Sequence, residues 1–388
     1  MAVTNKIGLA AVQNCYVALE TTKGTAVYPS DVDTVIASAG YIEMSQNITF
    51  TDSEEVVNSR DVLDRFQDQT SAGTWSMPIY LRPSGTAGSV PMGDILYQTL
   101  MGTKTVVGGT SVTYSQALEK PSFTLWSKRG HTLFFATGAT VSQCTVNATN
   151  KGGAMMSLSG GFMQMGWAGR DDLTAQALSA ATTLVVADSK KFTVGARIWN
   201  ATQALHNTSL GYTVTAVDYG TDTLTVTPAI GADWEIGDVV EGYLPTTGTV
   251  VGEALENRKT VVTIDGATVP LQSLDIDISD GIQYIEDEIS ANDYPSDYLE
   301  QKRAISGTLN LYFRTNDAKY FYDAYNTSAQ VPIVVTFGTV AGSIVTLNLP
   351  QCELEVPTPS TNAPAINLSI PFSALGSSGE DSCSIVFT

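Results

Sequence analysis

The residues best suited to chemistry in this 388-residue sequence are a short acidic series in its second half. The stretch Asp275–Gly281, with Glu286 beyond it, resembles the alternating carboxylates of a calcium-binding loop. Its glycine falls one place late, however, and Ile276 and Ile278 between the acids give the two-residue alternation of a strand. The series therefore predicts a strand with one acidic face, and we expect no metal there.

Other candidates for catalysis are few. His131 follows a glycine and His206 lies in a polar stretch, and neither belongs to a nucleophile elbow or a glycine-rich phosphate loop. Glu286, Asp287 and Glu288 are adjacent in sequence, so they do not converge as paired catalytic carboxylates do. We therefore expect a protein that is not an enzyme and needs no cofactor.

Composition restricts the class of protein further. The net charge of −19, from 39 acids and 20 bases, argues against a phosphate-binding surface and is explained by solubility. No apolar stretch approaches the roughly 18 residues of a membrane span, and the N-terminus lacks a signal-peptide pattern. Cys15, Cys144, Cys352 and Cys383 show no Cys-x-x-Cys spacing, which favours free buried thiols. We expect a soluble protein made inside a cell.

The elements that would carry these residues occur twice in the same order: strand, acid-rich segment, strand, helix. In the second half they are Leu274–Ile278, residues 287–302, Ile305–Phe313 and a helix from Asn316. In the first half they are a strand through Ile42, Met44, Ile48 and Phe50, the segment 52–70, Ala72–Arg82 and the helix Gly93–Leu100. The repeated order indicates two related modules.

The ends of the two halves agree as well. Val141–Val146 matches Leu349–Leu354, and Met155–Phe162 resembles Ile366–Phe372. We therefore take Gly73 with Gly307, and Cys144 with Cys352, as repeat-equivalent positions. A repeat of this length predicts a duplicated domain, because solenoid and propeller repeats are much shorter.

The pattern predicts four consecutive regions. Residues 1–40 read as a loosely attached N-terminal arm, 41–168 as the first module, and 250–388 as the second module with a C-terminal arm. Between the modules, residues 171–246 carry short strands and close turn signals, including a hairpin turn at 218–222. This segment has no counterpart in the second half, so we interpret it as an inserted all-β domain.

This order of parts resembles the tail tube proteins of long-tailed bacteriophages, over residues 1–168 and 250–388. The resemblance implies a mainly β fold with two homologous β-sandwich modules, each with one flanking helix. It also implies trimeric, pseudo-hexameric rings that stack into a hollow tube for the genome, with the inserted domain outside. The implied location is the phage tail of the virion, after synthesis in the host bacterial cytoplasm.

The resemblance also implies the partners. They would be other copies of the chain, tail tip and terminator proteins, the tape measure protein, and double-stranded DNA that passes without sequence-specific binding. The inserted domain would make weak contact with the host surface.

Two sets of residues become candidates for assembly. The loops 51–72 and 286–304 are long for structureless connections, and ring-on-ring stacking would explain their length and polarity. The stacking candidates are Asp52, Glu54, Glu55, Arg60, Asp61, Asp64, Arg65, Glu286, Asp287, Glu288, Asp293 and Asp297. Asp275 and Asp277 are candidates for an acidic lumen that repels the DNA duplex, although an outer surface or a ring joint would also suit them.

Two other functions remain open. One is a different ring-forming tail or neck component. The other is a carbohydrate-binding β protein, in which Trp199, Trp234, Tyr212 and Tyr219 would supply stacking surfaces; polymerisation would distinguish the tube from it.

Overall fold

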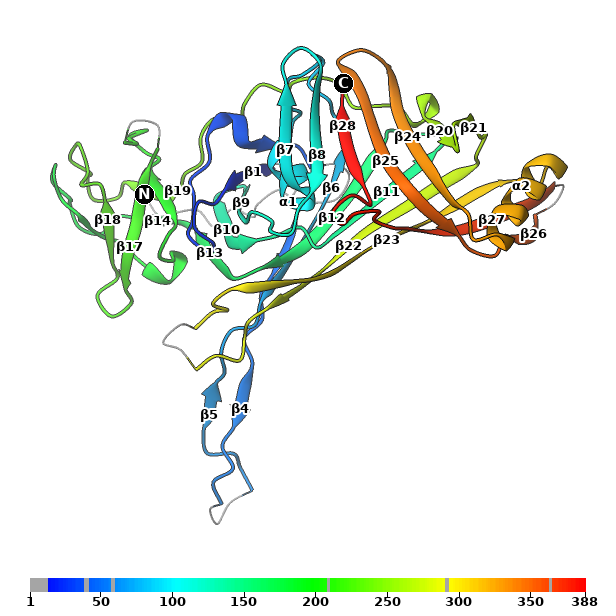
Figure 1. The fold of residues 1–388 in the computed structure, drawn as a ribbon. Coiled ribbons are helices and arrows are strands. Elements are labelled where there is room, and N and C mark those ends of the chain that lie inside the picture. The colour runs from blue at the N-terminus through cyan, green and yellow to red at the C-terminus, as the bar shows by residue number, and fades with distance from the viewer. Residues whose placement is uncertain (1–12, 38–41, 57–59, 208–209, 290–292, 363–364) are drawn as a thin grey trace.

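The structure is a computed structural model, and most of the chain is placed in it (Figure 1). The residues that it describes are 13–37, 42–56, 60–207, 210–289, 293–362 and 365–388. This part of the chain is mainly β and has one α-helix in each half, which confirms the predicted fold class. None of its helices is long and apolar enough to span a membrane.

The elements fall into three consecutive groups. The first group is β1 (Gln13–Leu19), β2 (Thr34–Val35), β3 (Glu43–Ser45), β4 (Phe50–Asp52), β5 (Arg65–Gln67), β6 (Gly73–Tyr80), α1 (Asp94–Met101), β7 (Gly102–Val107), β8 (Ser111–Gln116), β9 (Phe123–Arg129), β10 (Thr132–Ala139), β11 (Gln143–Thr149), β12 (Met155–Phe162) and β13 (Gln164–Ala168). The second is β14 (Arg170–Asp172), β15 (Thr183–Val185), β16 (Arg197–Asn200), β17 (Tyr212–Asp218), β18 (Thr223–Thr227) and β19 (Val239–Gly242). The third is β20 (Val261–Ile264), β21 (Ala267–Thr268), β22 (Ser273–Tyr284), β23 (Tyr298–Tyr312), α2 (Thr315–Asn326), β24 (Gln330–Val340), β25 (Ser343–Leu354), β26 (Thr358–Asn362), β27 (Ala365–Ala374) and β28 (Ser384–Phe387).

One large sheet runs through both halves. Its order is β3-β6-β12-β11-β22-β23-β27-β25-β24-β20-β21, so the halves meet where β11 pairs with β22. Strand alternation decides its faces: Leu274, Ile276 and Ile278 are buried, whereas Asp275 and Asp277 between them point to the opposite face.

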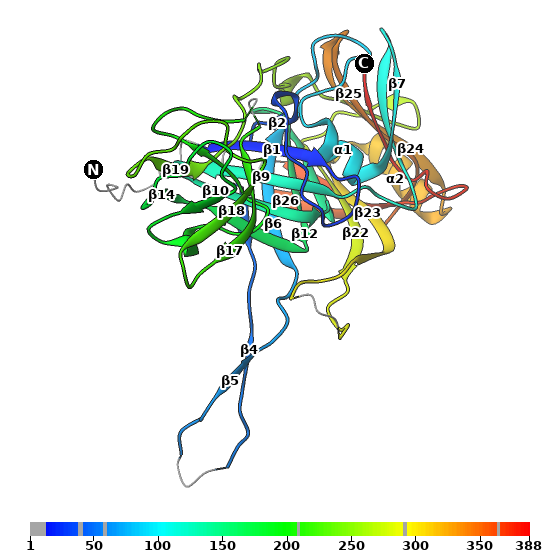
Figure 2. The ribbon, with the colours of Figure 1, turned by 90° about the vertical axis from the view of Figure 1, so that its left-hand side faces the viewer.

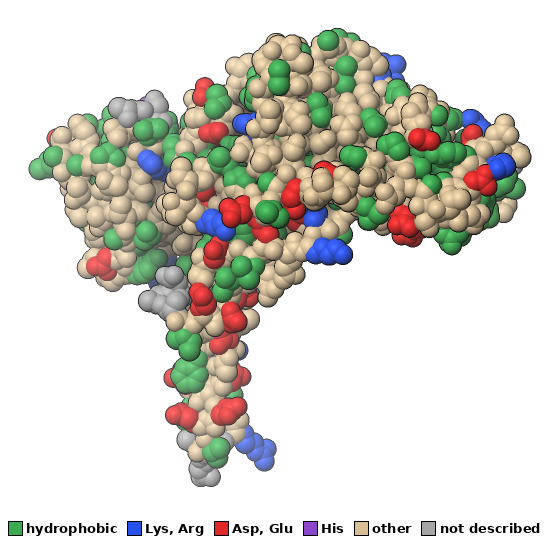
Figure 3. Space-filling view, viewed as in Figure 1, with side chains coloured by type: hydrophobic (Ala, Val, Ile, Leu, Met, Phe, Trp, Pro, Cys, Tyr) green, Lys and Arg blue, Asp and Glu red, His purple; other side chains and the backbone are tan. Residues whose placement is uncertain are grey.

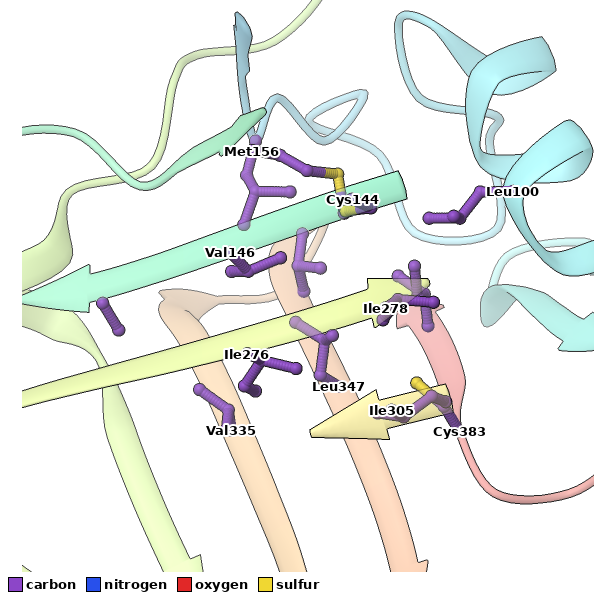
Figure 4. Close-up of a cluster of buried hydrophobic side chains, with 14 of the residues drawn as sticks. Leu100, Cys144, Val146, Met156, Ile276, Ile278, Ile305, Val335, Leu347 and Cys383 are labelled. Atoms are coloured by element: carbon purple, nitrogen blue, oxygen red, sulfur yellow. The ribbon is translucent and has the colours of Figure 1, made fainter. Parts of the chain in front are cut away.

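The apolar face of this sheet packs on a second layer. In the second half this layer is the far part of the same sheet. Figure 4 shows Val146 of β11 and Ile276 of β22 beside Val335 of β24 and Leu347 of β25. In the first half the second layer is a separate sheet of order β13-β10-β9-β1-β2. Because each sheet is apolar on one face, packing the two faces together buries the core of a two-layer sandwich.

The central residues form a six-stranded sheet of their own. Its order is β14-β19-β16-β17-β18-β15, and a bridge between Leu173 and Val186 brings its two edges together. Its core is not independent, because Tyr16, Trp126 and Phe135 of the first half belong to the same buried cluster.

The structure describes part of each region that was predicted as a terminal arm, and in both it contains a paired strand. Strand β1 pairs with β9 from Gln13 to Leu19 and is largely buried, so the described part of residues 1–40 is an integral part of the fold. Residues 1–12 and 38–41 lie outside the described residues. At the other end, β28 pairs with β25 and with β8, so Ser384–Phe387 is a closing strand that joins the halves.

The predicted loops are corrected too. The strand expected at Leu274–Ile278 continues to Tyr284, and its partner begins at Tyr298, so residues 298–304 belong to β23. The expected strand through Ile42 and Phe50 is divided into β3 and β4. Residues 51–72 are not structureless, because β4 pairs with β5.

Candidate assembly surfaces

In each half a glycine lies beneath a phenylalanine ring of the neighbouring strand. Gly73 of β6 is paired with Phe162 of β12, and Gly307 of β23 with Phe372 of β27. A Cβ atom would lie 2.0 Å from Cζ of Phe162 at the first glycine and 2.4 Å from Cζ of Phe372 at the second. In both places the ring fills the space that any other residue would need.

Cys144 and Cys352, which were predicted to be repeat-equivalent, are both buried, but their strands have different registers relative to the phenylalanines. Cys144 lies opposite Leu158, before Phe162 on β12, whereas Cys352 lies opposite Ala374, beyond Phe372 on β27. Burial raises the pKa of Cys144 well above its usual value and raises that of Cys352 to about 12. Both side chains therefore act as small apolar groups of the core.

The joint between the halves is an antiparallel strand pair. It runs from Gln143 opposite Ser279 to Thr149 opposite Ser273. On its polar face the Thr145 hydroxyl donates a hydrogen bond of 2.6 Å to Asp277 Oδ1. The joint shows that one half can extend the sheet of the other through backbone hydrogen bonds.

The polar face across this joint is rich in small uncharged side chains. Directly opposed residues of antiparallel strands share a face, so the register defines rows. One row crosses Pro78, Ser157, Thr145, Asp277, Ser306 and Ser373; the next crosses Tyr80, Met155, Asn147, Asp275, Thr308 and Pro371. Neither row contains a lysine or arginine. Burial, together with the charge of Asp277, raises the pKa of the Asp275 carboxyl.

Several sheet edges are open in the described part of the chain, and two of them are β3 and β26. Strand β3 pairs only with β6, and β26 pairs only with β27, as β7 and β21 of the same sheet also have one partner each. Unpaired edges of this kind can bind another chain by strand addition. In the chain β3 precedes β6 and β26 precedes β27, as β22 precedes β23 and β11 precedes β12.

A narrow arm carries the first set of predicted stacking residues. The strands β4 and β5 project from one side of the molecule, well beyond the two-layer body (Figure 2). Asp52 and Arg65 form an ion pair of 2.6 Å across the arm. The structure places on this arm, all exposed, Asp52, Glu54, Glu55, Arg60, Asp61, Asp64 and Arg65.

The arm also exposes apolar side chains, which the sequence analysis did not single out. Val56 is 97% exposed, and Phe50 and Phe66 lie on the two strands with about half of their surface in solvent. Figure 3 shows hydrophobic and acidic side chains together along the arm. Exposed apolar groups on a projecting segment indicate a surface that is covered in an assembly.

The second predicted loop lies against the base of this arm. The Glu286 carboxylate accepts a hydrogen bond of 2.6 Å from the backbone N–H of Ala72, and the Asp293 carbonyl accepts one of 2.9 Å from Thr70. The Glu288 carboxylate accepts a hydrogen bond from the Ser296 hydroxyl, and Asp297 forms an ion pair of 3.0 Å with Lys23. The Asp287 side chain is exposed. The structure thus brings the two sets of stacking candidates together on one side of the molecule, where the second set supports the arm.

A buried ion cluster behind this base was not found from the sequence. Lys120 and Asp280 form an ion pair with almost no solvent exposure, and Arg303 contacts the same carboxylate at 2.5 Å. Arg303 also contacts Glu380 at 2.7 Å. Lys120 belongs to the first half and its partners to the second, so no local sequence pattern could have connected them.

The aromatic candidates of the six-stranded sheet are dispersed. Trp234 and Tyr212 are buried and pack edge to face, with ring centroids 5.5 Å apart. Trp199 is half-buried against Tyr243, and Tyr219 lies exposed on the β17–β18 hairpin. These four side chains therefore form no single stacking surface. Within the described residues, no group of three or more His, Cys, Asp or Glu side chains could hold a metal ion.

Comparison with known proteins adds independent information. Residues 200–374 match the profile of a family described as phage tail tube protein. The matched span runs from the end of β16 through β27, so it includes the internal joint strand β22 and the open edge strand β26. No curated protein matches the chain.

Proposed function

We propose that the chain is a structural component of the phage tail, since residues 200–374 match the phage tail tube family, and that three copies of it close into a ring. Stacked rings then form the hollow tube through which the genome enters the host. The observation that carries this proposal is the β11–β22 joint, because it is a complete example, within one chain, of how one module extends the next.

The two halves act in this proposal as duplicated modules, residues 41–168 and 250–388. The glycine–phenylalanine contacts at Gly73 and Gly307, and the order strand, strand, helix in each half, support the duplication. A ring of three chains then has six modules, with three joints inside chains and three between them. Linking two modules in one chain raises the effective concentration for every second joint.

The joint between chains follows from the internal one. If Gly73 corresponds to Gly307 and Phe162 to Phe372, then β3 and the residues after it correspond to β22, and β26 corresponds to β11. Strand β26 of one copy therefore pairs with the β3 edge of the next. Both edges gain the hydrogen bonds that they lack in the single chain.

The polar face of the sheet lines the lumen in this arrangement. Its rows of hydroxyl and amide side chains, with Asp275 and Asp277 as charges, offer no cation to DNA phosphates. Each basic contact to a phosphate would add salt-dependent adhesion, so a wall without such contacts lets the duplex slide.

The arm and the loop 285–297 project along the tube axis and contact the next ring. Their position on one side of the molecule, and the exposed Val56, Phe50 and Phe66, support this role. The six-stranded sheet of residues 170–242 lies at the far end of the molecule from α2 (Figure 1) and occupies the outside of the tube. The tape measure protein, tip and terminator proteins are the remaining tail partners.

Disulfide cross-linking of full-length protein tests the ring. Asn47, just after β3, and Ser360 on β26 are exposed and lie directly opposite each other in the proposed joint, as Asp277 and Thr145 do in the internal one, and all four native cysteines are buried. We expect oxidised Asn47→Cys/Ser360→Cys protein to give covalent dimers and trimers and nothing larger, with hollow rings in negative-stain electron micrographs. Each single variant is the control. A product that stays monomeric, or a ladder that continues beyond the trimer, would contradict the closed ring.

A further inference from the structure

A groove lies on the side of the molecule opposite the arm. It is about 270 Å³ in volume and lies between the start of β22 and the segment Asn257–Thr260 that leads into β20. Val261, Val269 and Leu271 supply apolar side chains to its lining. In Figure 1, β20 and β21 lie at the top right, whereas β4 and β5 project from the bottom.

Two polar atoms in the groove are buried without a hydrogen-bond partner in the described structure. They are Oδ1 of Asn257 and Oγ1 of Thr260. The Asn257 side chain is 6% exposed, and its Nδ2 donates to the carbonyls of Lys151 and Gly153 at 3.1 Å each, which fixes the amide. An unpaired buried acceptor is unfavourable, so the floor of the groove is less well satisfied than the rest of the described core.

The rim of the groove is basic. Lys151 lies at the turn beside it, and Arg258 and Lys259 lie on its edge, with the single acid Glu256 paired to both at 2.6 and 3.7 Å. In a chain of net charge −19, such a grouping selects acidic partners through charge complementarity.

The arm has the complementary chemistry. Near its end it exposes Val56, Val62 and Leu63, each with more than half of its surface in solvent. Acids flank these side chains at Glu54, Glu55, Asp61 and Asp64, with Arg60 as the single base among them. At roughly 3.3 Å per residue, the segment from Thr49 to Val56 extends about 25 Å from the body.

We propose that this groove binds the arm of a second copy, in the adjacent ring. Val62 and Leu63 cover the apolar lining, and the acids meet Arg258 and Lys259. The contact joins opposite sides of two copies head to tail, so it can repeat without limit along an axis. The inference rests on the ring stacking proposed above and specifies where the arm binds.

Cross-linking separates this contact from the ring joint. In full-length Val62→Cys/Val261→Cys protein, the two introduced thiols lie on opposite sides of one molecule, and the native cysteines are buried. We expect oxidation to give a ladder of covalent multimers that extends beyond the trimer. The matched control is Val62→Cys/Val340→Cys, since Val340 is exposed at the β24–β25 turn and does not line the groove. A ladder of equal yield in the control, or none in the test variant, overturns the proposal.

Charge reversal gives a second, independent measurement. We expect Arg258→Glu/Lys259→Glu to lower the fraction of stacked rings at least tenfold in electron micrographs while single rings still form. Adding Glu54→Lys/Glu55→Lys to the same chain should restore stacking, and Lys319→Glu on α2, where the side chain pairs with Asp323, should change nothing. Stacking that is unaffected by the reversal, or lost and not restored, excludes the arm as occupant. Absence of rings in every variant would instead contradict the ring itself, and the cross-linked ladder still decides the groove.

Discussion

Phe372 covers Gly307 so closely that a Cβ atom on the glycine would lie 2.4 Å from the ring, and Phe162 covers Gly73 in the same way at 2.0 Å. Each pair joins directly opposed residues of neighbouring strands in the large sheet. The contact requires a residue without a side chain on one strand and an aromatic ring on the other. Its presence in both halves is the most specific structural correspondence between them.

These glycines give the first prediction. Gly73→Ala and Gly307→Ala should each destabilise the chain by about 2 kcal/mol, because the added methyl group must displace a buried ring and, at Gly307, would also lie 2.4 Å from the backbone carbonyl oxygen of Asp275. Gly231→Ala is the matched control, since a Cβ there would meet nothing within 4 Å, and it should stay within about 0.5 kcal/mol. Urea unfolding of the three variants measures the difference. Equal stability of all three would show that the ring moves aside without cost.

The second prediction concerns the buried ion cluster of Lys120, Asp280 and Arg303. Lys120→Met should destabilise the chain by about 3 kcal/mol, because the Asp280 carboxylate stays buried and loses one of its two cationic partners. Lys319→Met removes an exposed pair with Asp323 and should cost less than about 1 kcal/mol. Thermal unfolding distinguishes the two. A small effect at Lys120 would mean that the cluster is not rigidly buried in solution.

The third prediction concerns pH. Burial and the Asp277 charge raise the pKa of Asp275 in the folded chain, so the folded state binds more protons than the unfolded state around that pKa. The ionised carboxyl therefore destabilises the fold at neutral pH, and this effect disappears as the pH falls below the usual value of 3.8. Asp275→Asn should be more stable than the parent chain at pH 7 and no more stable near pH 3.

Urea unfolding at several pH values measures this change, with Asp287→Asn, at an exposed loop residue, as the control. An advantage of the Asp275 variant that is the same at every pH would exclude titration as its cause.

The fourth prediction concerns the thiols. Burial raises the pKa of Cys352 and Cys383 to about 12 and raises that of Cys15 and Cys144 also, so the reactive thiolate is scarce and inaccessible. The native chain should react with a thiol reagent only after unfolding, when four groups appear. The exposed Ser45→Cys variant should react at once. A thiol that reacts rapidly in the native chain would contradict this packing.

The fifth prediction concerns the wall of the tube. Changing Asp275 and Asp277 to lysine should leave tubes intact and slow genome delivery, because each lysine adds a phosphate contact. Phage carrying the variant can be followed by the rate of DNA release, with Glu235→Lys, an exposed residue in the region 170–242 that is placed outside the tube, as the control. Normal release from intact tubes would place these residues away from the lumen.

The strands and helices with regular alternation could be predicted from the sequence. The helix expected at Gly93–Leu100 is α1 at Asp94–Met101, where Leu96 and Leu100 face the core and Gly102, at φ 112°, ends it. The extension of β22 and β23 was missed because residues such as Gln283, Gln301 and Lys302 are polar on both faces of the hairpin. These residues are strands because β22 and β23 pair with each other there, and such pairing leaves no periodic pattern of apolar residues in the sequence.

Relationships across long sequence distances could not be predicted. The sequence indicates neither that β1 would lie between β9 and β2 nor that Lys120 would contact Asp280. Local similarity in the sequence also indicated that Cys144 and Cys352 are equivalent positions, whereas their strands have different registers relative to Phe162 and Phe372. Strand register depends on neighbours and turns as well as on composition.

The cluster shared by the six-stranded sheet and the first half limits how freely that sheet can be exchanged. Tyr16, Trp126, Leu133 and Phe135 pack with Phe192, Ile198 and Trp234 across the boundary. Cutting out residues 170–242 would leave large apolar surfaces on both pieces, so an isolated fragment should aggregate. Transplanting this sheet into another chain would require the matching aromatic residues of β1, β9 and β10 to travel with it.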